Sequence, residues 1–220
     1  MTRQDAAYGQ RFDRRGPAHE FVASYAEENL VPTMAAPWDR HWIDLHRFRI
    51  GVNSTHSDVR QTVDQRSIEP VEIAANYLAR LEQLARGLIF RDQMAIHLSI
   101  RTSPQRNRSN KPSRTDVGLV YDCERTAEQE FAMAWIDEIY SRSVDLRIRR
   151  NYPGRGQSAP CVTRTLRRRL SELPYLGIGV WLNERWASRD NRRRAEAIHL
   201  LVESLESVVD ELQEYRAQAA

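Results

Sequence analysis

Hydrophobic residues recur with a helical period in five segments of the chain. In each of them, apolar side chains stand three or four positions apart, which places them on one face of an α-helix. The segment 70–89 is the clearest, with Leu78, Leu81 and Leu88 on its apolar face. Pro70 suits its first turn, where the missing N–H would have no partner. The five predicted helices span residues 19–30, 70–89, 126–142, 160–170 and about 190–216.

The helix predicted over 126–142 begins with a capping pattern. Thr126 and Gln129 have the spacing at which two side chains satisfy free backbone N–H groups reciprocally. Phe131 and Trp135 follow on the face that we expect to be buried. The pattern therefore predicts a helix that starts at Thr126.

Five short segments between the helices carry the apolar, β-branched and aromatic residues that are typical of strands. Strands that alternate with helices predict an α/β fold. We expect one domain over residues 1–220, built as a three-layer α/β/α sandwich with a mixed, mostly parallel sheet. The predicted strands span residues 42–47, 94–101, 116–121, 144–149 and 175–182.

Residues 50–68 and 102–115 are the two irregular segments between the predicted elements. Residues 102–115 are rich in Ser, Asn, Pro and Arg and follow a predicted strand directly. Because α/β proteins bind ligands where strands end, we expect a mobile basic active-site loop there, with plain disorder as the alternative. Residues 1–18 contain no apolar run that would indicate a secretory signal, and we expect them to be flexible.

Composition narrows the class of protein. Of the 220 residues, 41% are hydrophobic and 29% are charged, which fits a globular protein and excludes a largely disordered one. No run of about 18 apolar residues is present, so we expect no transmembrane helix and no membrane partner. Cys123 and Cys161 stand far apart, and we interpret them as reduced thiols in a cytoplasmic protein.

The net charge of +3 conceals an uneven distribution. Residues 101–115 sum to +5 and residues 142–169 to +8, which leaves −10 for the rest of the chain. This asymmetry indicates a small anionic ligand or an acidic protein surface as partner. A nucleic-acid surface is a third interpretation, although the chain has no nucleic-acid-binding motif. It would use Arg147, Arg149, Arg150, Arg155, Arg164, Arg167, Arg168 and Arg169, with Tyr152 for stacking.

His97 is the most informative single residue. On the strand predicted over 94–101, it shares one face with Ser99 and Arg101, because strand side chains alternate between faces. A polar triplet on an otherwise apolar strand predicts the wall of a cleft. A neutral imidazole is also a good ligand for zinc and similar ions. The competing interpretation is a core histidine whose nitrogens bind the backbone.

Asp44 and His46 form a second cluster. They stand two positions apart on the strand predicted over 42–47, so both side chains point the same way. A carboxylate and an imidazole on one face can bind a metal or act as a base with its orienting group. Arg47 can clamp a substrate carboxylate. A salt-bridged strand end is the alternative.

Three other histidines are weaker candidates. His41 would lie on the opposite strand face from His46, and His56 stands in a segment expected to be a solvated loop. His199 has apolar neighbours in the last predicted helix, so we expect it to serve packing.

Four motifs appear in an order that resembles a known family. The four motifs are WDRHWIDLHR at 38–47, IHLSIRTSP at 96–104, DVGLVYD at 116–122 and LPYLGIGVWLN at 173–183. Between the last two, residues 151–154 read NYPG, which is typical of a turn. They are similar to the S-R-L-V-I-D-x-N-R, I-H-S-F-T-P, D-V-G-L-L-Y-D and L-P-x-L-E-I-E-I-R-x-D strands and the N-x-P-Y turn of the N-formylglutamate amidohydrolase-like family. That family is associated with zinc-dependent amide hydrolysis.

The resemblance implies a divergent metal-dependent amidohydrolase that acts on a small N-acylated, N-formyl-type carboxylate substrate. The expected ligands of zinc or another divalent metal are His46 and His97. The expected catalytic carboxylates are Asp44 and Glu184. The expected substrate-binding residues are Arg47, Arg101, Asn151, Tyr152 and Arg155.

The chain departs from the family in two places. The family's first histidine motif, H-x-G or H-A-S-N, has no counterpart before Asp44, and Gly177, Gly179 and Trp181 stand where the family has Glu, Glu and Arg. Glu184 replaces a lost carboxylate only if the strand bulges. Two interpretations stay open. In the first, the chain is an enzyme with a rebuilt metal site, and the glycines make room for a bulky group. In the second, the chain is an inactive binding or partner subunit, possible as a homodimer, with an arginine-rich surface for an anionic ligand.

Overall fold

The computed structural model describes residues 17–29, 32, 34, 68–103, 112–143, 145–152, 161–185 and 190–219. The chain divides into two compact units. The first comprises Met1–Phe12, Met34–His97 and Pro160–Leu176, and the second comprises Asp13–Thr33, Leu98–Ala159 and Gly177–Ala220.

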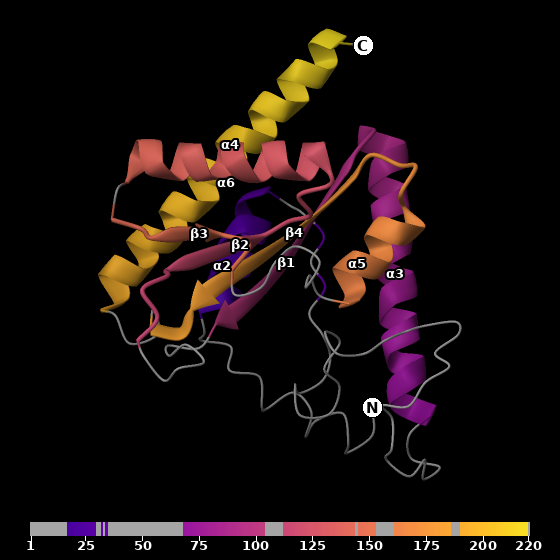
Figure 1. Ribbon diagram of the computed structural model, residues 1–220, viewed down its shortest axis with the longest axis horizontal. Helices are drawn as coiled ribbons and strands as arrows, with labels where there is room; N and C mark the ends of the chain where they lie inside the picture. The colour runs from indigo at the N-terminus through magenta and orange to yellow at the C-terminus, as the bar shows by residue number, and fades with distance from the viewer. Residues whose placement is uncertain are drawn as a thin grey trace. The chain divides into compact units, whose positions relative to one another are not determined.

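Helices and strands are interspersed along the described part of the chain (Figure 1). Each of the five predicted helices is present, and its ends differ from the prediction by at most a few residues. The elements are α2 (Pro17–Asn29), α3 (Ile68–Asp92), β1 (Ala95–Ser103), β2 (Val117–Val120), α4 (Thr126–Arg142), β3 (Ile148–Arg150), α5 (Cys161–Arg169), β4 (Tyr175–Asn183) and α6 (Asn191–Ala219).

The four strands form one sheet in the order β1-β4-β2-β3. β2 runs parallel to β3 and antiparallel to β4, so that Val117 stands opposite both Ile148 and Leu182. β1 and β4 point the same way in Figure 1. The predicted α/β class, with a mixed, mostly parallel sheet flanked by helices, is confirmed.

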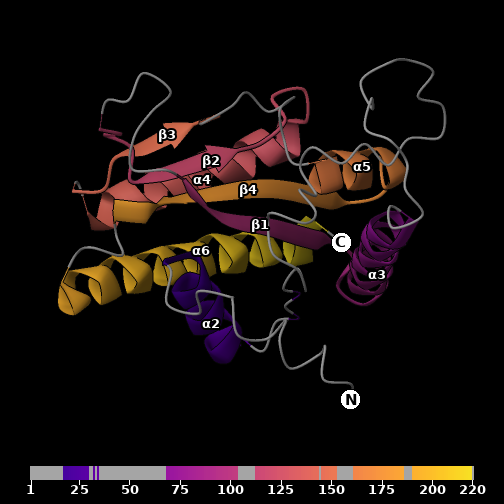
Figure 2. The ribbon, with the colours of Figure 1, turned by 90° about the horizontal axis from the view of Figure 1, so that it is seen from below.

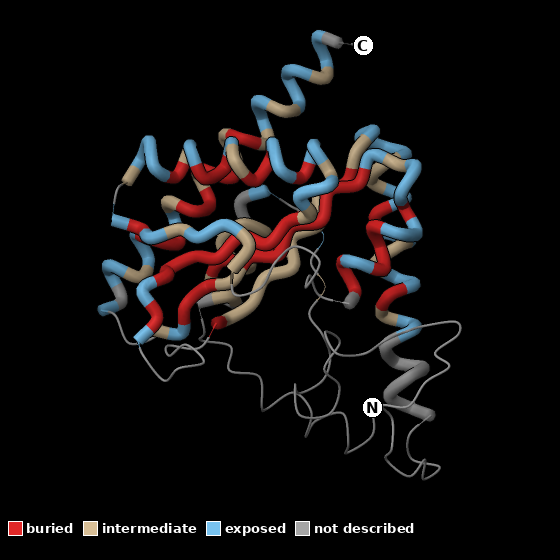
Figure 3. The backbone as a smooth tube through the Cα atoms, in the orientation of Figure 1, coloured by how far each residue is buried: buried red, intermediate tan, exposed pale blue. Residues whose placement is uncertain are grey.

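The core of the second unit lies where α2, α4 and α6 pack together beside the sheet (Figures 1 and 2). Trp135 of α4 is fully buried, and its indole Nε1 donates a hydrogen bond to Ser204 Oγ of α6 at 3.0 Å. The ring of Phe21, from α2, lies 6.4 Å from that of Trp135. β4 is buried on both faces along most of its length (Figure 3), so its near-continuous apolar sequence reflects a central strand.

The first unit has a core of its own. Leu78 and Ala85 of α3 pack against Leu166 of α5, and Tyr175 at the start of β4 belongs to the same cluster. Arg169 Nη1 binds Glu82 Oε2 at 2.8 Å and so ties α5 to α3 at the surface. The apolar residues of α3 and α5 are therefore spaced so that they face this shared cluster.

The capping box predicted at Thr126 and Gln129 is wrong, although the helix begins at Thr126. The N-cap is Arg125, and it makes no side-chain capping bond. Glu128 instead is fully buried and accepts hydrogen bonds from the backbone N–H of Asp122 at 3.0 Å and of Gly177 at 3.1 Å. The carboxylate thus satisfies one N–H group beyond the end of β2 and one within β4, which a local sequence pattern does not reveal.

Three other predictions need correction or fall outside the described part of the chain. Of the basic loop predicted over 102–115, Thr102 and Ser103 belong to β1 and Ser113 is buried, whereas residues 104–111 lie outside the described residues. The strand predicted over 144–149 begins at Ile148. The strand predicted over 42–47 lies outside the described residues.

Among the described residues, no helix is long and apolar enough to cross a membrane.

Candidate functional site

His97 lies on β1 with its ring held by a tyrosine. Its Nδ1 is 2.7 Å from the phenolic oxygen of Tyr175, and the two ring centroids are 6.1 Å apart. Tyr175 is fully buried at the start of β4, where Ala95 N donates to Pro174 O at 3.0 Å. The partner of His97 is therefore a side chain from a neighbouring strand, and this contact fixes the orientation of the imidazole.

The surroundings of His97 favour the neutral imidazole. Loss of hydration on burial, and secondly the positive charge of Arg167, lower the pKa of His97 to about 4. The side chain is consequently uncharged at pH 7. A neutral imidazole keeps a lone pair, so it can ligate a metal or accept a proton.

Arg167 lies in the interior, which the sequence analysis did not foresee. Its exposed fraction is 5%, and it stands on α5 four residues after Thr163, which is fully buried. A residue in this position cannot reach the phosphates of a nucleic acid, so its assignment to that surface is wrong. The signal was present in the sequence, because Arg167 lies next to the buried stripe of Leu166 and Leu170.

Of the two metal ligands predicted from the sequence, the described residues include His97. They contain no group of three or more His, Cys, Asp or Glu side chains placed to hold a metal ion. His97 fits the chemistry of a ligand, whereas Asp44, His46 and the neighbouring Arg47 lie outside the described part of the chain. A metal site as predicted would need ligands from those residues.

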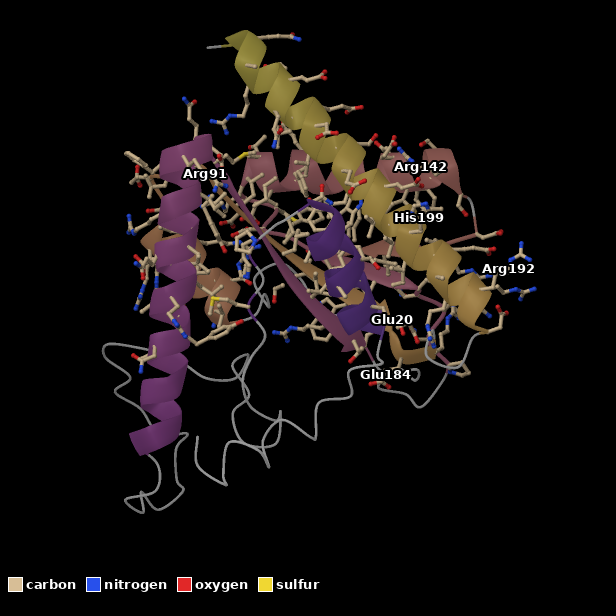
Figure 4. The ribbon with its side chains drawn as sticks, turned by 180° about the vertical axis from the view of Figure 1, so that it is seen from behind. Glu20, Arg91, Arg142, Glu184, Arg192 and His199 are labelled. Carbon is tan, nitrogen blue, oxygen red and sulfur yellow. The ribbon has the colours of Figure 1, made fainter. Side chains whose placement is uncertain are left out.

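Glu184, which the sequence predicts to be a catalytic carboxylate, lies directly after β4. β4 ends at Asn183, and Glu184 follows it as an exposed residue (Figure 4). The bulge that would turn its carboxylate into the strand face is absent from β4.

Gly179 and Trp181 of β4 both have close neighbours. A Cβ atom added at Gly179 would lie 3.3 Å from Val120 Cβ, which is a tight contact. Gly179 therefore lies close to the side chain of Val120 on the neighbouring strand. Trp181 contributes its ring to a cation–π contact, with the guanidinium carbon of Arg101 5.0 Å from the ring centroid.

Asn151 holds a turn next to β2 and β3. Its φ is 50°, a left-handed conformation that asparagine tolerates better than most residues. Its Oδ1 accepts a hydrogen bond from Tyr121 N at 3.1 Å, and its Nδ2 donates to Cys123 Sγ at 3.0 Å. Both ends of the amide therefore have protein partners.

Tyr152 packs beside the same turn. The guanidinium carbon of Arg149 lies 5.0 Å from the centroid of its ring, and its hydroxyl is 3.5 Å from Ser113 Oγ. Its carbonyl oxygen occupies the space where any side chain at Gly118 would have to stand. Arg155, the third residue predicted to bind substrate in this region, lies outside the described residues.

Asp116 is a buried carboxylate whose role the sequence did not reveal. Its exposed fraction is 1%. Its Oδ1 accepts a hydrogen bond from Arg185 Nε at 3.1 Å, and its Oδ2 accepts one from Arg147 N at 3.1 Å. Asp116 therefore joins the chain before β3 to the turn after β4.

His199 is exposed rather than packed, contrary to expectation. It lies on the outer side of α6 (Figure 4), and its Nε2 is 3.2 Å from Glu203 Oε1, one helical turn later. Its apolar neighbours in sequence face the other way. His199 is therefore an exposed histidine paired with a glutamate of its own helix.

Comparisons with known proteins agree with this architecture. No family model matches the sequence, and no curated protein matches it. The crystal structure of gene product Atu2144 from Agrobacterium tumefaciens superposes with a TM-score of 0.63 at 13% identity, covering 97% of this chain and 87% of that one. An N-formylglutamate amidohydrolase from Ralstonia eutropha JMP134 gives a TM-score of 0.49 at 18% identity, covering 71% of this chain and 56% of that one. The chain thus shares the fold of the Atu2144 protein.

Proposed function

We propose that the chain is a divergent metal-dependent amidohydrolase that acts on a small N-acylated carboxylate of the N-formyl type. The contact between His97 Nδ1 and Tyr175 Oη, at 2.7 Å, carries this proposal. Histidines that bind metals use one ring nitrogen for the ion and the other for an orienting hydrogen bond. When Nδ1 donates its proton to Tyr175, Nε2 keeps the lone pair that a metal requires.

The charge state of His97 supports the same role. Its low pKa, caused by burial and by Arg167, keeps the ring neutral at the pH where an enzyme of this kind works. In the proposal, His46 is the second ligand, and Asp44 is either a third ligand or a carboxylate that orients a ligand. A divalent metal, when bound, polarises the amide carbonyl and lowers the pKa of a bound water. Tyr175 holds the imidazole of His97 in a fixed orientation through its hydrogen bond to Nδ1.

A non-catalytic binding role is the second candidate. It is favoured by Gly177, Gly179 and Trp181, which stand where the related motif carries two carboxylates and an arginine. Within the described residues, Glu128 is the carboxylate next to Gly177, and two backbone N–H groups and the guanidinium of Arg125 engage it. It is therefore committed to structure rather than to a metal.

Formate release from N-formyl amino acids tests the first candidate. The purified protein is assayed with added zinc, manganese or iron(II). We expect turnover that is lost in His97→Ala and kept in His199→Ala, because His199 is an exposed histidine paired with Glu203. No formate with any of these metals, or equal rates in wild type and His97→Ala, would contradict the proposal. Stoichiometric binding of an N-formyl amino acid without turnover would favour the second candidate.

A further inference from the structure

Three exposed arginines stand close together at one edge of the sheet. Arg147 directly precedes β3, and Arg149 and Arg150 lie within it. Within the described part of the chain, none of the three guanidinium groups forms an ion pair with a carboxylate. The guanidinium carbon of Arg149 lies 5.0 Å from the centroid of the Tyr152 ring, and Arg150 Nη1 is 3.5 Å from Met133 Sδ. These contacts orient two of the side chains but do not neutralise their charge.

Other exposed arginines of the second unit have counter-charges. Arg142 binds Glu138 at 2.7 Å, and Arg192 binds Glu196 at 2.8 Å, each across one helical turn. Such pairs are common on helix surfaces. Three like charges within four positions of β3 repel one another instead, and the positive potential that they create attracts an anionic partner.

β3 is the edge strand of the described sheet. It is the last strand in the order and bonds to β2 along one side (Figures 1 and 2). Arg147 O and Asn151 N both form hydrogen bonds toward β2. Backbone groups of successive strand residues point in opposite directions, so those of Ile148 and Arg150 face the outer edge. This edge therefore has the geometry to pair with a further strand.

The hydroxyl of Tyr140, on α4, occupies part of the outer edge. It accepts a hydrogen bond from Ile148 N at 3.3 Å and donates one to Ile148 O at 3.5 Å. One hydroxyl thus satisfies the N–H and the C=O that a neighbouring strand would otherwise bind. Both distances exceed the usual range of about 2.7–3.2 Å, and 41% of Tyr140 is exposed. An incoming strand can therefore displace this hydroxyl.

The mixture of donor and acceptor on this edge favours a peptide as the partner. A peptide unit supplies both an N–H and a C=O, whereas the phosphates of a nucleic acid supply only acceptors. A second copy of β3 is a poor partner, because edge-to-edge pairing would set arginines against arginines. The charge of the edge and its hydrogen-bonding groups are together complementary to an acidic peptide.

We propose that the outer edge of β3 binds an acidic, extended segment of a partner protein, which adds to the sheet as a further strand. Side chains of a strand alternate between the two faces of a sheet, so Arg147 and Arg149 serve one face of the added strand and Arg150 serves the other. The partner segment therefore carries carboxylates at consecutive positions. Neither a metal nor hydrolysis is needed, so this proposal is independent of the proposed function.

Fluorescence anisotropy with the full-length protein tests the proposal. The probe is a fluorescein-labelled peptide of eight residues in which Glu and Asp alternate, and its Gln and Asn counterpart and an eight-nucleotide oligothymidylate are measured at the same ionic strength. We expect saturable binding of the acidic peptide and binding of the amide peptide that is weaker by about tenfold or more. Tighter binding of the oligonucleotide would overturn the proposal in favour of a nucleic-acid surface. Absence of saturable peptide binding would also overturn it.

The double variant Arg147→Gln/Arg149→Gln tests the charge of the edge. Both side chains are exposed, so we expect the fold to be kept and the affinity for the acidic peptide to fall by about tenfold. The matched control is Arg192→Gln/Arg193→Gln, which removes the same charge from exposed side chains at the start of α6. Equal losses in the two proteins would mean that the peptide responds to net charge alone, which contradicts binding at β3.

Tyr140→Phe tests the addition of a strand. The variant removes the hydroxyl that competes for Ile148 N and O, so we expect it to bind the acidic peptide about threefold more tightly than the wild type does. Circular dichroism checks that the variant is folded. An affinity that stays the same or falls would show that the peptide does not take the place of this hydroxyl, and would overturn strand addition at β3.

Discussion

At the scale of the residue, the chemistry of His97 depends on two neighbours that are distant in sequence. Tyr175 contacts its Nδ1 from 78 positions away, and Arg167 repels a proton on the ring. The alternation of side chains along 94–101 predicts that His97 is special, but it does not name either neighbour. Both contacts arise from the way α5 and the start of β4 pack within their unit.

The low pKa of His97 predicts how stability depends on pH. Above about pH 6.5 the histidine is neutral in the folded and the unfolded protein and contributes nothing to the difference between them. Between about 6.5 and about 4 the unfolded chain binds a proton that the folded protein refuses, so the free energy of unfolding falls as the pH is lowered.

Urea unfolding of the wild type and of His97→Gln at pH 7 and pH 4.5 measures this effect. The carboxylates titrate alike in both proteins, so the difference between them isolates His97. We expect the wild type to lose more stability than the variant over this interval. An equal loss would mean that the folded protein protonates His97 as readily as the unfolded chain does.

At the scale of the element, the helices were predictable because each buries a continuous apolar stripe. The helix over 126–142 begins and ends where its pattern does. The partners of its first turn were not predictable. Glu128 accepts hydrogen bonds from the N–H groups of Asp122 and Gly177, and only the folded sheet brings these groups together. Local spacing therefore locates a helix more reliably than it identifies the partners of its first turn.

The strand predicted over 144–149 shows a similar limit. Asp116 Oδ2 accepts the N–H of Arg147, and the backbone N–H groups of Asp116 and Val117 both bind Arg147 O. A regular ladder therefore starts only at Ile148. The apolar, β-branched sequence predicts an extended segment. It does not predict that the carboxylate of Asp116, rather than a backbone carbonyl of β2, accepts the N–H of Arg147.

Two glycines give an opposed pair of predictions at this scale. A Cβ atom at Gly118 of β2 would collide with the carbonyl oxygen of Tyr152, whereas one at Gly87 of α3 would meet no atom within 4 Å. We expect Gly118→Ala to lower the free energy of unfolding by about 1–3 kcal/mol. Gly87→Ala should raise it by about 0.5–1 kcal/mol, because alanine favours a helix.

Urea denaturation of both variants beside the wild type checks these expectations. Each substitution adds the same methyl group, so the comparison separates backbone crowding from the general effect of alanine. A Gly118→Ala protein as stable as the wild type would contradict the close approach of Tyr152 to β2.

At the scale of the whole molecule, the α/β class and the mixed sheet follow from the alternation of helices and strands, and the fold resembles that of the Atu2144 protein. The site was less predictable. Asn151 and Tyr152 have protein partners, and Glu184 is exposed, whereas Arg167 and Tyr175 were not recognised as neighbours of His97. Side chains from separate segments meet there, and sequence spacing within one segment does not record such meetings.

Metal content tests the central claim most directly. The wild type and His97→Ala are purified without a metal-affinity column and without chelator, and transition metals are measured by mass spectrometry. The account predicts about one zinc or other divalent ion per wild-type chain and a clear loss in His97→Ala, with both proteins folded. Absence of metal from the wild type, or the same stoichiometry in both proteins, would contradict a metal site that includes His97.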